Sequence, residues 1–171
     1  MKALIIFESM FGNTQSIACA IAEGLQDTYD VSIADVSGMP RAYGVDLLVV
    51  GGPTHAFSMS RASTREDAAR KGTVREGSVA AGLREYFDCS PVLHGIPAAA
   101  FDTKVNKPLL PGSAARKAQK ELRRLGCRIV LPAENFLVTD TTGPLVEGER
   151  ERARQWGVAL AAAAAAQSHK V

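Results

Sequence analysis

The residues most able to do chemistry lie in a short loop that follows the first apolar run of the chain. This loop, Glu8–Thr14, reads ESMFGNT and leads directly into a segment with helical spacing. Ser9, Asn13 and Thr14 can donate side-chain hydrogen bonds to phosphate oxygens. Gly12 lets the backbone approach a ligand closely, and the helix N-terminus behind it attracts anions because its first N–H groups lack partners. The pattern indicates a phosphate site or, alternatively, an ordinary capped turn that binds nothing.

The charge of this loop narrows the choice of phosphate ligand. There is no Lys or Arg between Glu8 and Thr14. A nucleoside triphosphate loop would carry GxxxxGK[ST], and a dinucleotide loop would carry GxGxxG, of which only one glycine is present. A monophosphate, with a charge of about −1.5 to −2, is held well by neutral donors at a helix terminus. We therefore expect a monophosphate rather than a triphosphate or a dinucleotide.

Apolar runs and helical periodicity predict the elements that position this loop. We expect five buried strands, at Lys2–Phe7, Tyr29–Ala34, Asp46–Val50, Ile96–Phe101 and Cys127–Leu131. We expect one helix from Thr14 and others at Gly77–Asp88, Ser113–Leu125 and Val146–Ala166, with Ser113 as N-cap and Gly126 as stop. A short extended piece, Phe136–Thr139, either prolongs the fifth strand or forms an edge. The alternation predicts an α/β fold, a doubly wound five-stranded parallel sheet in a three-layer α/β/α sandwich.

Length and composition limit the classes of protein to which this chain can belong. The chain has 171 residues, 46% hydrophobic and 22% charged, so we expect a single globular domain over residues 1–171. The net charge of +2 argues against a general nucleic-acid binder. The three cysteines form no close pair, so we expect reduced thiols and no metal site. There is no signal-peptide pattern or long apolar stretch, so we expect a soluble, cytoplasmic protein without membrane insertion.

The segment IIFESMFGNT, from Ile5 to Thr14, resembles the strand–loop–helix start of the flavodoxin family. In that family an apolar strand is followed by Ser and then by Thr or Phe, Gly, Asn and Thr. Element order and length extend the resemblance over almost the whole chain and fit the short-chain form. The resemblance implies strand order 2-1-3-4-5 and FMN as the cofactor, bound at the carboxyl ends of the strands.

The resemblance also implies which residues bind FMN. The residues that match the phosphate loop are Ser9, Met10, Phe11, Gly12, Asn13 and Thr14. The residues that match the loop after the third strand, which touches the isoalloxazine ring in the family, are Pro53, Thr54, His55, Ala56 and Phe57. Residues 101–104, FDTK, match the loop after the fourth strand that flanks the other face of the ring, with Asp102 and Thr103 as binding residues. No catalytic side chain is expected, because the flavin carries the redox chemistry.

Three groups of residues at this site have two interpretations each. His55 either hydrogen-bonds or guides a proton at the ring, or it caps a local turn. Phe57 either stacks on the ring or anchors the long polar connection Ala56–Glu76 into the core. Lys104, Lys107 and the arginines from 61 to 75 either form a basic rim that attracts an anionic partner or NAD(P)H, or they are a solvated surface.

Departures from the electron-carrying flavodoxins keep three functions open. The loop after the fourth strand has no Tyr, the loop after the third has no Trp, and the net charge is positive where carriers are usually acidic. The first function is a flavodoxin-like FMN protein that transfers electrons to or from a redox partner protein. The second is an FMN-dependent NAD(P)H–quinone reductase or a protoporphyrinogen-oxidising enzyme. The third is a flavodoxin-shaped binding module that has lost FMN.

Overall fold

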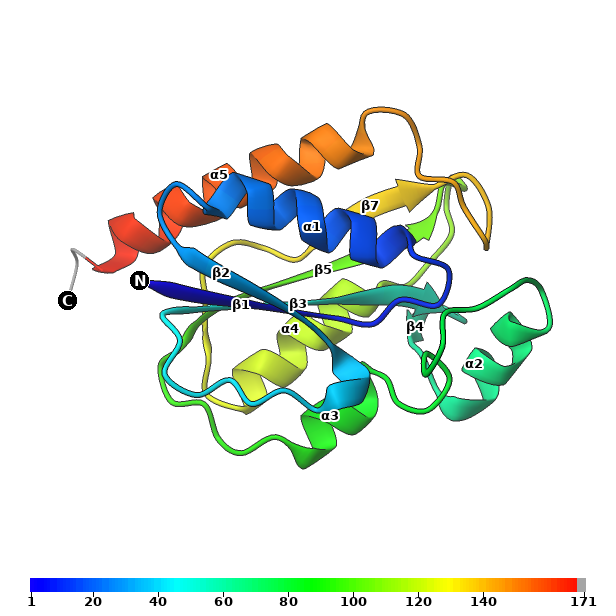
Figure 1. The fold of residues 1–171 in the computed structure, drawn as a ribbon, viewed down its shortest axis with the longest axis horizontal. Coiled ribbons are helices and arrows are strands. Elements are labelled where there is room, and N and C mark those ends of the chain that lie inside the picture. The colour runs from blue at the N-terminus through cyan, green and yellow to red at the C-terminus, as the bar shows by residue number, and fades with distance from the viewer. Residues whose placement is uncertain (169–171) are drawn as a thin grey trace.

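A twisted parallel sheet forms the centre of the protein (Figure 1). The structure is a computed structural model that describes residues 1–168. The sheet order is β2-β1-β3-β5-β6, and its members are β1 (Lys2–Phe7), β2 (Asp30–Asp35), β3 (Leu47–His55), β5 (Pro97–Val105) and β6 (Arg128–Ile129). All of these pairs are parallel. The doubly wound sheet and the strand order expected from the sequence are confirmed, β5 and β6 being the fourth and fifth expected strands.

Helices cover both faces of the sheet and enclose two apolar cores (Figure 1). On one face lie α1 (Asn13–Leu25) and α5 (Glu149–Ser168), and on the other lie α3 (Leu83–Cys89) and α4 (Ala114–Arg124). The first core centres on the edge-to-face rings of Phe101, Phe136 and Trp156. Close packing of α1 on α5 depends on Gly24, since a Cβ there would lie 2.1 Å from the Arg154 carbonyl oxygen. None of the described helices is both long and apolar enough to cross a bilayer.

The fifth strand position of the sheet is occupied by two short strands. Strand β6 pairs with β5 at Pro97 and Ala98, and β7 (Glu134–Val138) pairs with β5 from Phe101 to Val105. Pro132 lies between them, and proline interrupts a ladder because it has no N–H to donate. The extended piece expected near Phe136 therefore prolongs the fifth strand position along the same edge of β5.

Two strands are longer than their apolar runs predict. Strand β3 continues through Gly51, Gly52 and Pro53 to His55, and β5 continues to Val105. The two extensions pair with each other, with Gly51 opposite Phe101 and Pro53 opposite Thr103. A Cβ at Gly51 would lie 2.1 Å from the Phe101 ring, so this glycine makes room for the aromatic core. The expectation that residues 101–104 form a loop is therefore wrong.

The long connection after β3 is partly regular. It forms the short antiparallel strand β4 (Ser58–Met59) against β3, and then helix α2 (Ala62–Ala69). The helix expected from Gly77 begins only at Leu83, after a series of turns. Another short element, the 3-10 turn Val36–Gly38, follows β2. The connection thus folds back beside the loop after β1 instead of extending into solvent (Figure 1).

Candidate functional site

Helix α1 begins without a side-chain cap. Gly12 is its N-cap residue, at φ 95°, a left-handed conformation that favours glycine. The Gly12 N–H donates to Ser9 Oγ at 3.1 Å, but no side chain accepts from the first turn of the helix. By contrast, Ser113 Oγ caps α4 by accepting from the Arg116 N–H at 3.2 Å. The first N–H groups of α1 are therefore left for an acceptor from outside the helix.

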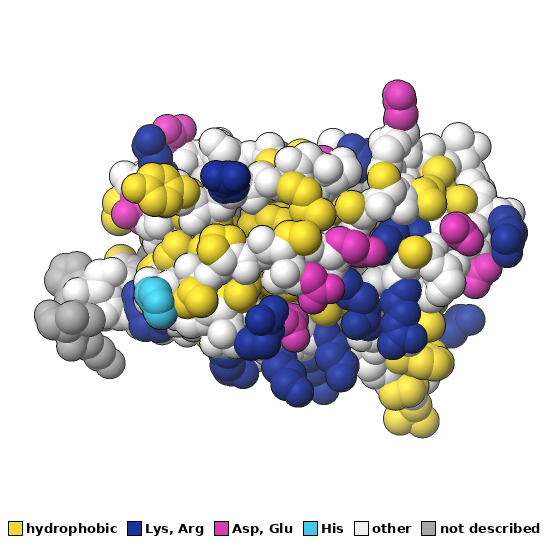
Figure 2. All heavy atoms as spheres, turned by 90° about the horizontal axis from the view of Figure 1, so that it is seen from below, with side chains coloured by type: hydrophobic (Ala, Val, Ile, Leu, Met, Phe, Trp, Pro, Cys, Tyr) yellow, Lys and Arg dark blue, Asp and Glu magenta, His cyan; other side chains and the backbone are white. Residues whose placement is uncertain are grey.

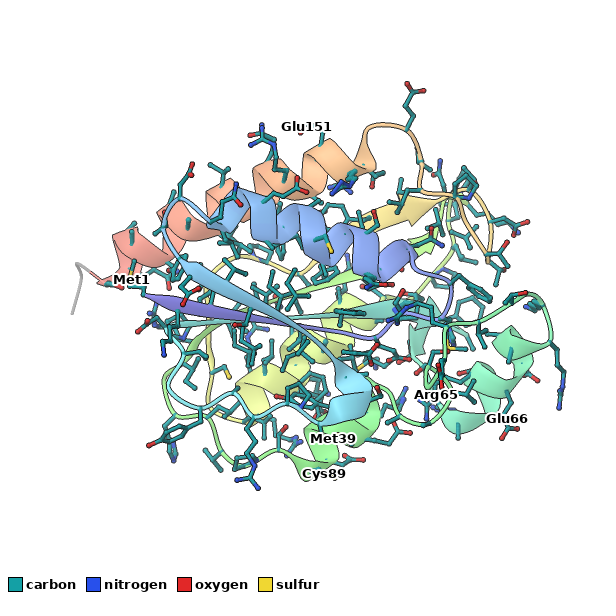
Figure 3. All side chains as sticks on the ribbon, in the orientation of Figure 1. Met1, Met39, Arg65, Glu66, Cys89 and Glu151 are labelled. Atoms are coloured by element: carbon teal, nitrogen blue, oxygen red, sulfur yellow. The ribbon has the colours of Figure 1, made fainter. Side chains whose placement is uncertain are left out.

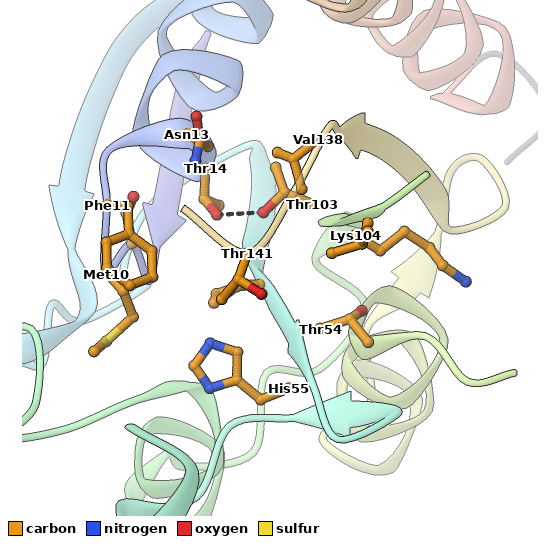
Figure 4. Close-up of a pocket in the computed structure, with 13 residues that line it drawn as sticks. Met10, Phe11, Asn13, Thr14, Thr54, His55, Thr103, Lys104, Val138 and Thr141 are labelled. Carbon is orange, nitrogen blue, oxygen red and sulfur yellow. Dashed lines mark hydrogen bonds between the residues drawn. The ribbon is translucent and has the colours of Figure 1, made fainter. Parts of the chain in front are cut away.

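A cavity of about 80 Å³ lies at the carboxyl ends of β1, β3 and β5, beside the start of α1 (Figure 4). Thr14 Oγ1 and Thr103 Oγ1 are 2.7 Å apart and join α1 to β5 beside it. Most of the cofactor-binding residues expected from the sequence lie on its wall. The full lining is Ser9, Met10, Phe11, Asn13, Thr14, Pro53, Thr54, His55, Thr103, Lys104, Val105, Val138 and Thr141.

Val138 and Thr141 are wall residues that the sequence did not indicate. Val138 ends β7 and Thr141 lies just after it, and the pairing of β7 with β5 brings this segment against the first loop. The Asn13 side-chain amide donates to the Thr142 carbonyl at 3.2 Å. A Cβ at Gly143 would lie 2.6 Å from Asn13 Oδ1, so the glycine permits this close approach. No local signal could find these residues, because the contact joins positions far apart in the chain.

Gly12, Ala56 and Phe57 are expected site residues that do not line the cavity. Gly12 is in the loop itself, whereas Ala56 and Phe57 form the turn between His55 and Ser58, which are paired. Ala56 and Phe57 have positive φ values of 44° and 70°. Residues other than glycine adopt positive φ in a hairpin turn at an energetic cost. Phe57 is 53% exposed, so the interpretation that it anchors the connection in the core is wrong. Its exposed side chain instead belongs to the turn that follows the cavity residue His55.

Asp102 is an expected ring contact that the structure places in the interior. Its side chain is fully buried, and Oδ2 accepts hydrogen bonds from Thr54 Oγ1 at 3.0 Å and from Ser113 Oγ at 2.7 Å. The Ala115 N–H also donates to Oδ2, at 3.0 Å. Side chains of a strand alternate between faces, so Thr103 is directed to α1 and Asp102 to α4. The expectation that Asp102 binds the ring is therefore corrected: it fixes the start of α4.

His55 is a neutral side chain on the cavity wall (Figure 4). Burial lowers its pKa to about 4, with further lowering by the positive charges of Arg65 and Lys71. At neutral pH the imidazole therefore has one N–H donor and one acceptor nitrogen. It is able to hydrogen-bond a ligand without carrying a charge.

A buried polar cluster beneath the first loop was not indicated by the sequence. Glu8 is almost fully buried and accepts from the Ser60 hydroxyl and, at 2.9 Å, from the Leu83 N–H. Arg65 is 1% exposed and donates to Ser60 Oγ at 2.8 Å and to Glu85 Oε1 at 2.5 Å. Figure 3 shows Arg65 directed inward from α2, on which Glu66 is exposed. Burial raises the pKa of Glu8, although its hydrogen bonds oppose the change in part.

Arg75 ties the same connection to the first loop. Its guanidinium donates to the Ser9 carbonyl and to Asp35, both at 3.0 Å, and lies 5.4 Å from the centre of the Phe7 ring. Its N–H donates to the Met10 carbonyl at 2.9 Å. The loop conformation is therefore fixed by the connection before any ligand binds.

Three of the four arginines from 61 to 75 are bound to other residues of the protein and are not free to form a basic rim. Arg65 and Arg75 are engaged in these clusters, and Arg70 pairs with Asp67 on the surface at 3.0 Å. Lys104 is on the cavity wall, but its Nζ donates to the Gly112 carbonyl at 2.9 Å. Of the expected rim, Lys104 lines the cavity and the charge of Arg65 acts on His55, as does that of Lys71, which was not part of the expected rim.

The protein is similar to solved structures, but the sequence comparisons found no match. No family model matches the chain, and no curated protein is similar to it by sequence. A flavodoxin from the domain Archaea superposes with a TM-score of 0.66 at 20% identity, covering 96% of this chain and 99% of that one. Oxidised flavodoxin 2 from Bacillus cereus gives a TM-score of 0.69 at 20% identity, covering 95% and 99%. The chain thus has the flavodoxin-like fold.

The same fold also matches part of a larger protein. The flavodiiron protein from Giardia intestinalis superposes with a TM-score of 0.60 at 20% identity. The match covers 99% of this chain but only 37% of that one. The fold therefore occurs both alone and as one part of a longer protein, and function has to be argued from the site.

Proposed function

We propose that this protein binds FMN at the carboxyl edge of its sheet and transfers electrons through the flavin. The observation that carries the proposal is the uncapped start of α1, which opens on a cavity whose polar lining residues are neutral apart from Lys104. Neutral donors at a helix N-terminus suit a monophosphate, because the dipole supplies part of the positive charge. The flavodoxin-like fold supports the same assignment.

The residues present fit the phosphate of FMN. Pockets that enclose a whole small molecule have volumes of about 300 Å³ or more, so a cavity of about 80 Å³ suits a phosphate-sized group. Ser9 and Thr14, both almost fully buried, would hold its oxygens together with the N–H groups of α1. The larger ring system would be held at the cavity mouth, near the turn after His55 that carries the exposed Phe57.

The chain also provides groups for the flavin ring. Bound FMN would supply one- and two-electron redox chemistry, while the protein binds and orients it. The neutral imidazole of His55 is available as a hydrogen-bond donor to a ring heteroatom. Arg65 and Lys71, whose charges act on His55, would stabilise negative charge on a reduced ring.

A second candidate function is an FMN enzyme that oxidises NAD(P)H and reduces a quinone, or that oxidises protoporphyrinogen. One observation favours it. The segment 106–112 after β5 has no aromatic residue, and its Leu109 is 99% exposed. This side of the ring would have no aromatic cover, which leaves room for a small substrate. Anaerobic reduction of the flavin by NAD(P)H alone would distinguish this enzyme from a carrier, which needs a separate redox partner protein.

The visible absorption spectrum tests FMN binding. We expect flavin bands in the purified protein, or after FMN is added and the sample is desalted. The variant Ser9→Ala/Thr14→Val should lose most of this retention while Thr28→Val, at an exposed position, should keep it. A protein that retains no flavin under either condition would be the binding module without FMN, and both redox functions would be excluded.

A further inference from the structure

The outer face of α4 carries a concentration of positive charge. Buried Ala114, Ala118 and Leu122 fix one face of the helix against the sheet. The opposite face carries the basic residues of the helix, which are Arg116, Lys117, Lys120, Arg123 and Arg124. Glu121 is the one acidic residue of α4. The five basic residues and one acidic residue give α4 a net charge of +4, and because the whole chain has a net charge of +2, the rest of the chain has a net charge of −2.

Most of these cations have no acidic partner. Arg124 pairs with Glu121 at 2.6 Å, but the side chains of Arg116, Lys117, Lys120 and Arg123 form no ion pair with any residue from 1 to 168. Helix α5 differs from α4 because its arginines do have acidic partners. Its arginines pair with carboxylates, as Arg150 does with Glu23 at 2.6 Å and Arg154 with Glu151 at 2.7 Å. Unpaired like charges on one face repel each other, and an acidic partner would relieve that repulsion.

The basic face begins next to the candidate flavin site. The Ala114 N–H, at the start of α4, donates to Thr54 Oγ1 at 2.9 Å, and Thr54 lines the cavity. Exposed apolar side chains lie at the same end, namely Phe57 and Leu109, which are 53% and 99% exposed. Gly112 brings their two segments together, since a Cβ there would lie 2.5 Å from Phe57 Cβ. Figure 2 shows Lys and Arg side chains gathered beside a hydrophobic projection.

We propose that this surface, the α4 face, docks an acidic redox protein. The α4 face consists of Arg116, Lys117, Lys120 and Arg123 with the apolar pair Phe57 and Leu109. The partner that fits it has an apolar spot surrounded by Asp and Glu and contains a one-electron metal centre. Bound FMN would take up one electron from that reduced centre, which would become oxidised by one electron, and the α4 face would hold the partner beside the flavin. The proposal rests on the proposed function, because it assumes a flavin at the neighbouring cavity.

Nucleic acid is the less suitable occupant of the α4 face. Single strands bind through aromatic side chains on which successive bases stack, and among residues 1–168 Phe57 is the one exposed ring near the face. The charges of α4 are also confined to a helix of 11 residues. An acidic protein needs only a compact patch with an apolar centre.

The first experiment measures binding without any electron transfer. FMN-loaded protein is titrated by calorimetry with an oxidised, strongly acidic [2Fe–2S] ferredoxin, with basic cytochrome c as the contrasting probe. We expect ferredoxin to bind and its affinity to fall at least about tenfold between about 20 and 300 mM NaCl, because salt screens exposed charges. Cytochrome c should not bind detectably. Equal affinity for the two proteins, or no ferredoxin binding, would overturn the proposal.

The second experiment places the binding on α4 with variants matched in charge. Lys117→Gln/Lys120→Gln removes two charges from the α4 face, and Lys2→Gln/Arg41→Gln removes two from exposed positions elsewhere. Glutamine has a helix propensity close to that of lysine, and circular dichroism checks that both variants fold. We expect ferredoxin affinity at low salt to fall about tenfold in the first variant and less than twofold in the second. Equal losses would contradict a localised docking face.

The outcomes separate this proposal from the proposed function. Flavin retained by both variants, with ferredoxin binding independent of α4 charge, would overturn the α4 face and leave FMN binding intact. Ferredoxin binding to a protein that retains no flavin would overturn the proposed function, and with it the electron transfer at this face. Tighter α4-dependent binding of a short DNA duplex than of ferredoxin would identify a nucleic-acid surface instead.

Discussion

The hydroxyls of Thr14 and Thr103 lie 2.7 Å apart and join the first turn of α1 to strand β5. Both residues are almost fully buried, and both lie on the wall of the candidate phosphate cavity. This contact fixes the helix N-terminus relative to the sheet. The donors that would bind phosphate are therefore in place before the ligand arrives, which reduces the entropy cost of binding.

Replacing Thr103 with Val removes this hydrogen bond and preserves the shape of the side chain. We expect the free energy of unfolding to fall by about 1 kcal/mol, because the buried Thr14 hydroxyl loses its partner. FMN affinity should fall several-fold as α1 becomes less fixed. Urea unfolding and FMN titration measure the two effects, with exposed Thr28→Val as the control. A variant with wild-type stability and affinity would show that the contact positions nothing.

Arg65→Met should be strongly destabilising. The substitution removes the donor to buried Ser60 and to Glu85, and with it the positive charge that acts on buried Glu8. Removing one partner of a buried ion pair costs about 3 kcal/mol or more, which urea unfolding would detect. The matched control is Arg70→Met, whose pair with Asp67 is solvent-exposed and contributes at most about 1 kcal/mol. Similar effects of the two variants would contradict the role given to the buried cluster.

His55 should make stability depend on pH between about 4 and 6.5. The pKa of His55 is lowered to about 4 in the folded protein, so the unfolded chain binds the proton more readily in that range. Its contribution to stability is therefore present above pH 6.5 and is lost as pH falls toward 4. Unfolding curves of wild type and His55→Gln should differ by a pH-dependent amount on the order of 2 kcal/mol. A constant difference across this range, or an NMR titration of His55 near pH 6.5, would contradict the lowered pKa.

Phe57→Gly should lower the affinity for FMN without lowering the stability of the protein. Glycine adopts the positive φ of 70° without strain, and the exposed Phe57 ring contributes little to the core. We expect the stability to stay the same or to rise by up to about 1 kcal/mol. FMN affinity should fall, because the aromatic face beside the cavity is lost. Thermal unfolding with FMN titration checks both, and unchanged FMN affinity would show that the ring does not contact the flavin.

The sequence predicted the helix ends that are set by residues within one turn of the end. Ser113 and Gly126 bound α4 as expected, because an N-cap hydroxyl and a glycine at positive φ act within one turn. Most of the first-loop residues expected to bind FMN line one cavity, and their role in binding stays a prediction. The chemistry of that loop lies in consecutive residues, so it is visible in the sequence.

The remaining features depend on contacts between distant segments. The length of β5, and with it the burial of Asp102, follows from pairing with β7, which is more than 30 residues away. From the sequence, Arg65 is expected to be an exposed charge. The partners that make its burial possible, Glu8 and Glu85, lie in other elements. Sequence patterns report which residues are apolar or polar, but not which distant group satisfies a polar one.

Competition between FMN and riboflavin tests the central claim most directly. Riboflavin has the same ring but no phosphate, so any difference in affinity reports on the group assigned to the start of α1. We predict that FMN binds about 100-fold more tightly than riboflavin in a fluorescence titration, a difference of about 2.7 kcal/mol. Equal affinities for the two molecules would contradict the assignment of the cavity to the phosphate.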